Sequence, residues 1–372
     1  MTRPGDLPAD EIGAVFGDAA LAESPAVVEP LAHTAVASAT AGLWRVRVGH
    51  RSAVVKVLAH APEGGSENWR SGVDVTHWYY WRREAEAYRS GLLGGLGGGL
   101  RAPRCELIAD RADGSVALWL EDLAGEAAPR WPIDRYRLAA RHLGQAQGEF
   151  AAGRALPDHP WLSRGWLYSY LAQPLRKLTL PSDPAVWGDP LLVEWFPDPP
   201  VDRLQAMSAD RSRFLDVLAH VPATVCHLDL HPANLFDGGA GTTAVIDWSF
   251  VGIGSFGEDA GNLVPDAVLD FHVAPEQLPH LYDAVADGYA AGLRDAGWSG
   301  PHSTARLAMA ATMAAKYAWI GPALVRSVAE RRPTLNGRPI AEALSWWAPT
   351  MCFLLDRADE ARDLSGQAHA QG

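Results

Sequence analysis

Two short segments place two carboxylates and one amide side chain close together in the sequence. Residues 227–236 read His-Leu-Asp-Leu-His-Pro-Ala-Asn-Leu-Phe, and residues 245–248 read Val-Ile-Asp-Trp. Between them lies the Gly-rich stretch 237–241, which indicates a β-hairpin with a Gly-rich turn. Such a hairpin would fold Asp247 back over Asn234, so any fold of this chain has to bring the two segments together.

Asp229, Asn234 and Asp247 have the chemistry that phosphoryl transfer from a nucleoside triphosphate requires. One carboxylate orients the attacking hydroxyl and accepts its proton, while an amide oxygen and a second carboxylate hold the magnesium ions that neutralise the phosphates. Asn supplies a hard oxygen without adding negative charge beside the phosphates. The spacing from Asp229 to Asn234 is that of kinase catalytic loops.

A simpler interpretation exists for His227 and Asp229 taken alone. A His-x-Asp sequence on a loop could be a surface pair or part of a metal site. The ordered addition of Asn234, the hairpin and Asp247 favours phosphoryl transfer over that interpretation.

With these motifs, the chain resembles the aminoglycoside phosphotransferase and choline kinase-like superfamily of small-molecule kinases. The resemblance implies an α+β, two-lobed protein-kinase-like fold. An N-terminal antiparallel sheet lobe with one helix is expected over residues 1–123, and a larger, mainly helical lobe with the catalytic loop, metal site and acceptor pocket over 124–372. It also implies that Asp229 is the catalytic base and that Asn234 and Asp247 are the metal ligands.

Three further residues of this region match the family. His231 stands where protein kinases often carry a lysine near the γ-phosphate, and it could touch phosphate or only shape the loop. His227 is expected to be a structural residue of the loop. Asp259 is expected to accept hydrogen bonds from the catalytic-loop backbone, and an Asp at a helix N-terminus is the overlapping alternative.

The resemblance also predicts a strand lysine that pairs with a helix glutamate. Lys56 lies in the β-branched stretch 52–58 and is one of only two lysines before the catalytic loop. Glu84, in the helical stretch 81–89, is preferred over Glu86 as its partner. An edge-strand lysine and a solvated helix face would explain each residue alone, but their joint occurrence in the expected order weakens both explanations.

The nucleotide-binding backbone is expected in two places. The apolar stretch 116–120 runs into Glu121-Asp122-Leu123, which resembles the hinge of these kinases, so adenine would bind backbone groups from Glu121 to Leu123. The loop over the phosphates is expected within 34–42.

That phosphate loop departs from the family pattern, because it has small residues and one glycine where kinases have a Gly-rich motif. Its backbone amides, with the hydroxyls of Ser38 and Thr40, would contact phosphate instead. Two other departures are Ser249 in place of a Gly and Leu228 in place of an Arg.

Composition excludes several classes of protein. The 372 residues suffice for two lobes with separate cores, and 48% hydrophobic with 20% charged residues is an ordinary globular composition. No apolar run reaches membrane-spanning length, and the first residues lack the apolar core of a signal peptide. A net charge of −12 without a basic block argues against nucleic-acid binding. The three cysteines have no metal spacing and an odd count, so we expect a reduced, cytoplasmic protein. A monomer or homodimer is expected.

Hydrophobic periodicity predicts helices over 1–30, from about 126, and over 276–296 and 303–330. In the helix after 126, the residues at helical spacing that should be buried are Tyr136, Leu138, Ala139, Leu143, Ala146 and Phe150. Many of the aromatic residues fall before the catalytic loop and near the C-terminus, where they could stack on an acceptor or pack in the core.

Together these features predict a kinase that uses ATP (or GTP) and Mg²⁺ to phosphorylate a hydroxyl of a small molecule. An antibiotic (aminoglycoside-like, nucleoside or other) is the preferred acceptor, which would make the protein a resistance kinase. A metabolite kinase for a sugar, amino alcohol or amino acid is the alternative. A non-catalytic, nucleotide-binding pseudokinase is disfavoured because Lys56, Asp229, Asn234 and Asp247 are all present.

Overall fold

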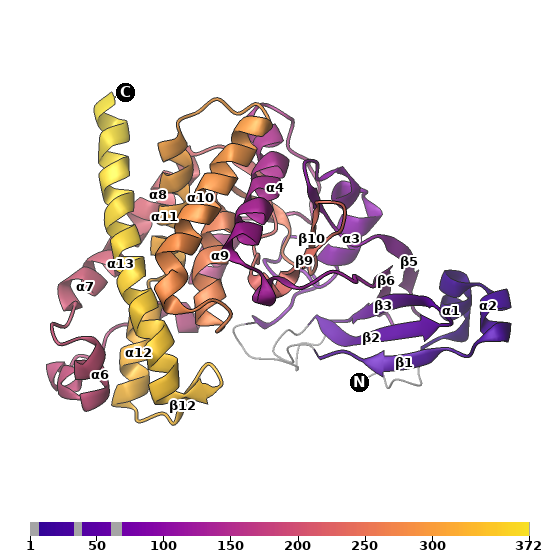
Figure 1. Ribbon diagram of the computed structural model, residues 1–372, viewed down its shortest axis with the longest axis horizontal. Helices are drawn as coiled ribbons and strands as arrows, with labels where there is room; N and C mark the ends of the chain where they lie inside the picture. The colour runs from indigo at the N-terminus through magenta and orange to yellow at the C-terminus, as the bar shows by residue number, and fades with distance from the viewer. Residues whose placement is uncertain (1–6, 33–38, 61–68, 372) are drawn as a thin grey trace.

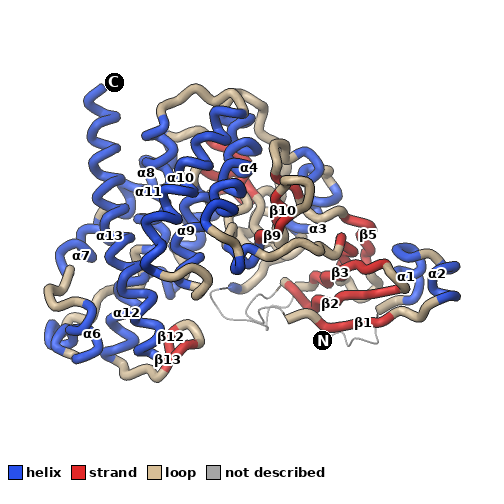
Figure 2. The backbone as a smooth tube through the Cα atoms, viewed as in Figure 1, coloured by secondary structure: helices blue, strands red, loops and turns tan. Residues whose placement is uncertain are grey.

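The computed structural model describes residues 7–32, 39–60 and 69–371 of the chain. Figure 1 shows a sheet built by the N-terminal part beside a larger group of helices from the remainder. Figure 2, coloured by secondary structure, shows most strands gathered on one side and the long helices on the other. This is the α+β architecture predicted from the sequence. The division of the chain into units at residue 123 stays a prediction.

The N-terminal sheet has five antiparallel strands in the order β1-β2-β3-β6-β5. In chain order they are β1 (Val27–Pro30), β2 (Thr40–Val48), β3 (Arg51–Leu58), β5 (Cys105–Asp110) and β6 (Val116–Glu121). Alternate residues of β2, including Trp44 and Val46, pack with Phe16 of helix α1 (Ala9–Phe16). The other face carries Leu118 of β6 and is part of the main core with α3 (Arg83–Arg89).

The predicted helix over 1–30 is only partly correct. The structure has α1 and a short α2 (Asp18–Glu23), but 27–30 form strand β1. Pro25 disfavours helical backbone at Ser24, and the β-branched Val27 and Val28 pair with β2 instead.

The helical part centres on α4 (Ile133–Ala151), which lies against α10 (Leu278–Asp295). The two backbones touch through glycines, since a Cβ on Gly144 or on Gly288 would lie 2.2 Å from a carbonyl oxygen of the other helix. The helices predicted over 276–296 and 303–330 are confirmed, the second one as two helices. Of the six residues of α4 predicted to be buried, four are, while Leu138 and Phe150 are half-buried.

The remaining helices surround this pair. They are α5 (Trp166–Leu171), α6 (Pro190–Trp195), α7 (Val201–Ala209), α8 (Arg211–His220), α9 (Glu258–Leu269), α11 (His302–Tyr317), α12 (Ile320–Ala329) and α13 (Ile340–Gln371). Among the described residues, no helix has the length and apolar character needed to cross a membrane.

Small sheets carry the two sequence motifs. The predicted hairpin is present as β9 (Leu235–Asp237) and β10 (Thr243–Val245), and β4 (Leu100–Arg101) adds to β10. A second small sheet joins β7 (Ser163–Arg164), β11 (Gly252–Ser255) and β8 (Ala223–Cys226). β12 (Thr334–Leu335) and β13 (Arg338–Pro339) form a separate pair.

Candidate active site

The loop after β8 is held by a buried carboxylate. Asp259, in the first turn of α9, accepts hydrogen bonds from the backbone N–H groups of His227 (2.8 Å) and Leu228 (2.7 Å), as the sequence predicts. Leu228 has a φ of 69°, a left-handed conformation that is costly for a branched side chain. These two bonds therefore help to fix a strained turn directly before Asp229.

The same loop is also tied to the β9–β10 hairpin. The Asn234 amide nitrogen donates to the backbone oxygen of Asp229 (3.0 Å), and the Ile246 N–H donates to the Asn234 carbonyl (3.0 Å). His227 Nε2 donates to the Ile246 carbonyl (2.9 Å), which fits its predicted structural role. The hairpin thus brings Asp247 beside the loop that carries Asp229 and Asn234.

Asp247 sits at the centre of a charged cluster. Its backbone φ is 61°, and its side chain is 41% exposed. Its Oδ1 lies 2.8 Å from Lys56 Nζ and accepts a hydrogen bond from the Ser249 hydroxyl. Removal from water would raise the pKa of the Asp247 carboxyl, but Lys56 and Ser249 hold it below its usual range. Asp247 is therefore a carboxylate at neutral pH.

Lys56 and Glu84 form the ion pair that the sequence predicts. Lys56 Nζ lies 2.6 Å from Glu84 Oε2, and the Glu84 side chain is only 1% exposed. Glu86 instead pairs with Arg89 at the surface, so the geometry selects Glu84. Burial raises the pKa of Glu84 and opposes the charge on Lys56, whereas Asp247 and Glu84 together raise the pKa of Lys56. Lys56 therefore stays a cation between two carboxylates.

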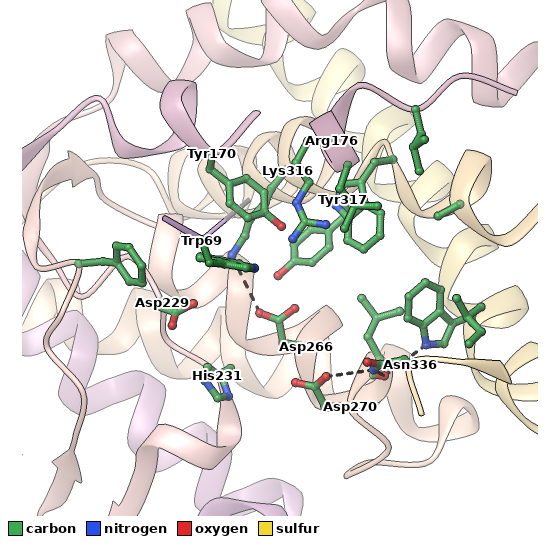
Figure 3. A pocket seen from close by; sticks show the side chains of 18 of the residues that line it. Trp69, Tyr170, Arg176, Asp229, His231, Asp266, Asp270, Lys316, Tyr317 and Asn336 are labelled. Carbon is green, nitrogen blue, oxygen red and sulfur yellow. Dashed lines mark hydrogen bonds and ion pairs between the residues drawn. The ribbon is translucent and has the colours of Figure 1, made fainter. Parts of the chain in front are cut away.

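A cavity of about 680 Å³ opens beside these residues (Figure 3). Of the predicted site residues, it brings together Thr40, Asp229, His231 and Asp247 in its lining. Lys56, Glu84 and Asn234 do not line this cavity, and they reach it only through Asp247 and Asp229.

Nucleotide binding by the backbone of the phosphate loop and of the hinge stays largely a prediction. Ser38 lies outside the described residues. Leu123 is half-buried and does not line the cavity. The Glu121 side chain pairs with Arg101 (2.7 Å), and its backbone N–H donates to the Arg104 carbonyl (2.8 Å), so this N–H is engaged within the protein. Adenine binding by backbone groups of Asp122 and Leu123 stays a prediction.

The cavity also contains residues that sequence reasoning missed. Its far side carries Arg176, Asp266, Asp270 and Lys316. Burial raises the pKa of Asp266, and it raises the pKa of Asp270 to about 6. Asp266 lies in α9 and Asp270 caps its C-terminus, four residues further on, so helical spacing places the two carboxylates on the same side. The sequence holds no local signal for Arg176 or Lys316. Of the aromatic residues that lie shortly before the catalytic loop or near the C-terminus, four line the cavity: Tyr170, Tyr317, Trp319 and Trp347.

Glu258, beside Asp259, makes the stability of the fold depend on pH. Burial, and then the Asp259 charge, raises the pKa of Glu258 to about 7. Because the folded pKa exceeds that of an unfolded Glu, this group's contribution is complete at low pH and is lost as pH rises through about 7. The unfolding free energy of the native protein should fall between about pH 5 and about pH 8. We expect Glu258→Gln to make this fall smaller by on the order of 1–3 kcal/mol. Urea denaturation of both proteins across that range measures it, and parallel pH profiles would contradict it.

Comparison with known proteins gives one family model and three similar solved structures. A model of the phosphotransferase enzyme family matches residues 37–301. An aminoglycoside phosphotransferase from Alicyclobacillus acidocaldarius subsp. acidocaldarius covers 91% of this chain and 92% of its own, with 13% identity and a TM-score of 0.53. This likeness shows the predicted kinase-like fold.

Two other solved structures are similar at lower scores. An amicoumacin kinase in complex with AMP-PNP and Ca²⁺ covers 96% of each chain at 13% identity, with a TM-score of 0.47. A choline/ethanolamine kinase family protein from Mesorhizobium loti covers 95% of this chain and 94% of its own at 14% identity, with a TM-score of 0.46. The comparison with curated proteins finds no match.

Proposed function

The chain belongs to the phosphotransferase enzyme family, and we propose that it transfers the γ-phosphate of ATP to a hydroxyl group of a small molecule. The observation that carries this proposal is the joint presence of Asp229 and Asp247 on one cavity, with Lys56 bound to Asp247 and to Glu84. A base, a metal-binding carboxylate and a phosphate-binding lysine are the parts that this reaction needs.

Asp229 is proposed as the general base. It lies on a loop fixed by Asp259 and Asn234, and it lines the cavity in which an acceptor would bind. In this role its carboxylate orients the acceptor hydroxyl and takes its proton as the oxygen attacks the γ-phosphorus. The bond from that phosphorus to the β-phosphate oxygen breaks, and ADP leaves.

Asn234 and Asp247 are proposed to hold Mg²⁺. The donor set suits this ion, because a carboxylate and an amide oxygen are hard ligands, and phosphate oxygens commonly complete its shell. Asp247 remains ionised and 41% exposed, so it can bind a cation without losing a proton. When bound, the metal would neutralise charge on the phosphates. The Asn234 amide nitrogen donates a hydrogen bond to the Asp229 backbone oxygen, which leaves the amide oxygen of Asn234 for the metal.

Lys56 is proposed to bind the α- and β-phosphates, positioned by Glu84. If the two residues act as one unit, Lys56→Ala and Glu84→Ala should each lower kcat/KM by about tenfold or more, and the double variant by little beyond either one. Glu86→Ala, on the same helix but at the surface, should change kcat/KM by less than about twofold. Steady-state kinetics on the four proteins of the double-mutant cycle measures the coupling. Fully additive single effects would reject the pair.

The acceptor is proposed to be an antibiotic, because the size and lining of the cavity suit one. A volume of about 680 Å³ with aromatic side chains such as Tyr170 and Trp319 suits a drug-sized ring compound. A small amino alcohol would leave much of this space unfilled. The three free cysteines of the described chain support a reducing, cytoplasmic site of action.

An ATP-consumption assay against a panel of hydroxylated antibiotics and metabolites tests the proposal. We expect turnover to require both Mg²⁺ and an acceptor, with drug-sized compounds preferred. Turnover that is confined to small sugars or amino alcohols would overturn the antibiotic assignment, and failure to bind Mg-ATP would overturn the phosphotransfer proposal itself.

A further inference from the structure

Arg176 is a buried cation on the cavity wall. Its exposed fraction is 8%, and its guanidinium carbon lies 4.0 Å from the ring centroid of Trp319 and 4.4 Å from that of Tyr170. Figure 3 shows it reaching into the cavity near Tyr170 and Tyr317. Its Nε and Nη1 are covered and have no hydrogen-bond partner among the residues that the structure describes. Two aromatic rings therefore hold this guanidinium without neutralising it.

The nearby carboxylate is already engaged. Asp266 lies 4.0 Å from Lys316 Nζ and interacts with the Tyr317 hydroxyl. Lys316 is itself 4% exposed and stands 5.3 Å from the Tyr170 ring centroid, so Asp266 is shared between two buried cations. Burial lowers the pKa of Arg176, which shows how unfavourable its surroundings are for a lone charge.

Other arginines of the same cavity differ from Arg176. Arg326 lies 3.4 Å and Arg332 2.7 Å from Glu330, so each is paired within the described chain. Burying a charge without a close ionic partner is unfavourable, and an anion bound beside it would offset that cost. The contrast marks Arg176 as a position prepared for an anionic group of a ligand.

We propose that the acceptor carries a carboxylate, which binds the Arg176 guanidinium between the aromatic side chains while the acceptor hydroxyl reaches Asp229. This inference rests on the proposed function and names its substrate class: hydroxylated compounds with an acidic group. A planar guanidinium can form two parallel hydrogen bonds with the two oxygens of a carboxylate.

Direct binding to the full chain tests the proposal with benzoate, its neutral amide benzamide, and phenyl phosphate as probes. Calorimetric titration should give a benzoate Kd at least about tenfold lower than that of benzamide, the difference expected for a hydrogen-bonded charge pair. Equal affinities, or no benzoate binding, would overturn it. Tighter binding of phenyl phosphate than of benzoate would overturn the carboxylate assignment.

Arg176→Met separates a binding role from a structural one. It keeps the apolar stem and removes the charge, so we expect a Tm no lower than that of the native protein and a benzoate affinity at least about tenfold weaker. A purely structural arginine would instead give a lower Tm and unchanged benzoate binding. Arg332→Met removes a paired arginine from the same cavity and should change the benzoate Kd by less than about twofold.

Two additions keep the test decisive. If Arg176→Met does not fold, Arg176→Gln and the acid–amide comparison on the native protein still decide the outcome. Mg-ATP titration of each variant separates this inference from the proposed function. Native protein that binds benzoate but not Mg-ATP would overturn the phosphotransfer proposal alone, whereas Mg-ATP binding without discrimination of acid from amide would overturn the acceptor class alone.

Discussion

Replacing Asp229 with asparagine is expected to lower kcat by ~100- to 10,000-fold while the Kd for Mg-ATP changes by no more than about threefold. The proposed base acts on the acceptor hydroxyl and does not bind the nucleotide, so the two effects should separate. The Asn234 contact is to the backbone oxygen of Asp229, which the substitution leaves in place. Steady-state rates together with calorimetric Mg-ATP titration measure both quantities.

The control for this variant lies on the hairpin that follows the Asp229 loop. Asp237→Asn changes a carboxylate of β9 that accepts from the Gly239 N–H and does not line the cavity, and it should retain kcat within about twofold. If Asp229→Asn keeps more than about a tenth of the native kcat, the base assignment is wrong. Loss of Mg-ATP binding in that variant would point to a folding defect.

Asp247 should matter more for nucleotide binding than any other single residue. We expect Asp247→Asn to weaken Mg-ATP binding beyond the ~10- to 100-fold that is typical for loss of an outer-shell partner of a metal, and Asn234→Ala to weaken it less. Asparagine is the informative replacement, because it tolerates the left-handed φ of 61° at this position, whereas alanine would add backbone strain.

Titration of Mg-ATP into the native and variant proteins checks this order. Ser249→Ala removes a hydroxyl that donates to Asp247 without removing the carboxylate, so it serves as the matched control with a smaller loss. Equal affinity for Mg-ATP in the native protein and in Asp247→Asn would mean that the metal assignment is wrong.

The central arrangement was predictable because its determinants are local. The Gly-rich stretch 237–241 between two apolar segments specifies the hairpin, and the hairpin alone brings Asp247 to the loop before Asn234. Lys56 could be identified because so few lysines precede the loop, and its pairing with Glu84 was implied by the family resemblance. The Asp259 bonds to the loop were predictable from its spacing within the family pattern.

Other features depend on contacts that the sequence does not encode locally. Residues 27–30 read as the end of a helical segment, and pairing with β2 makes them a strand. Arg176 lies in a short 3₁₀ helix, Pro174–Lys177, and only the packing of Tyr170 and Trp319 around it reveals a buried charge. Adenine recognition by backbone groups near Leu123 has no side-chain signature, so the sequence could only suggest it.

Phosphorus NMR of a reaction containing native protein, Mg-ATP and a hydroxylated acceptor tests the central claim most directly. The account predicts a new phosphomonoester signal from the acceptor, which grows as ATP is converted to ADP. With Asp229→Asn, this signal should be absent on the same timescale, although the variant binds Mg-ATP. Release of inorganic phosphate at equal rates from both proteins, with no phosphomonoester formed for any acceptor of a broad panel, would contradict it.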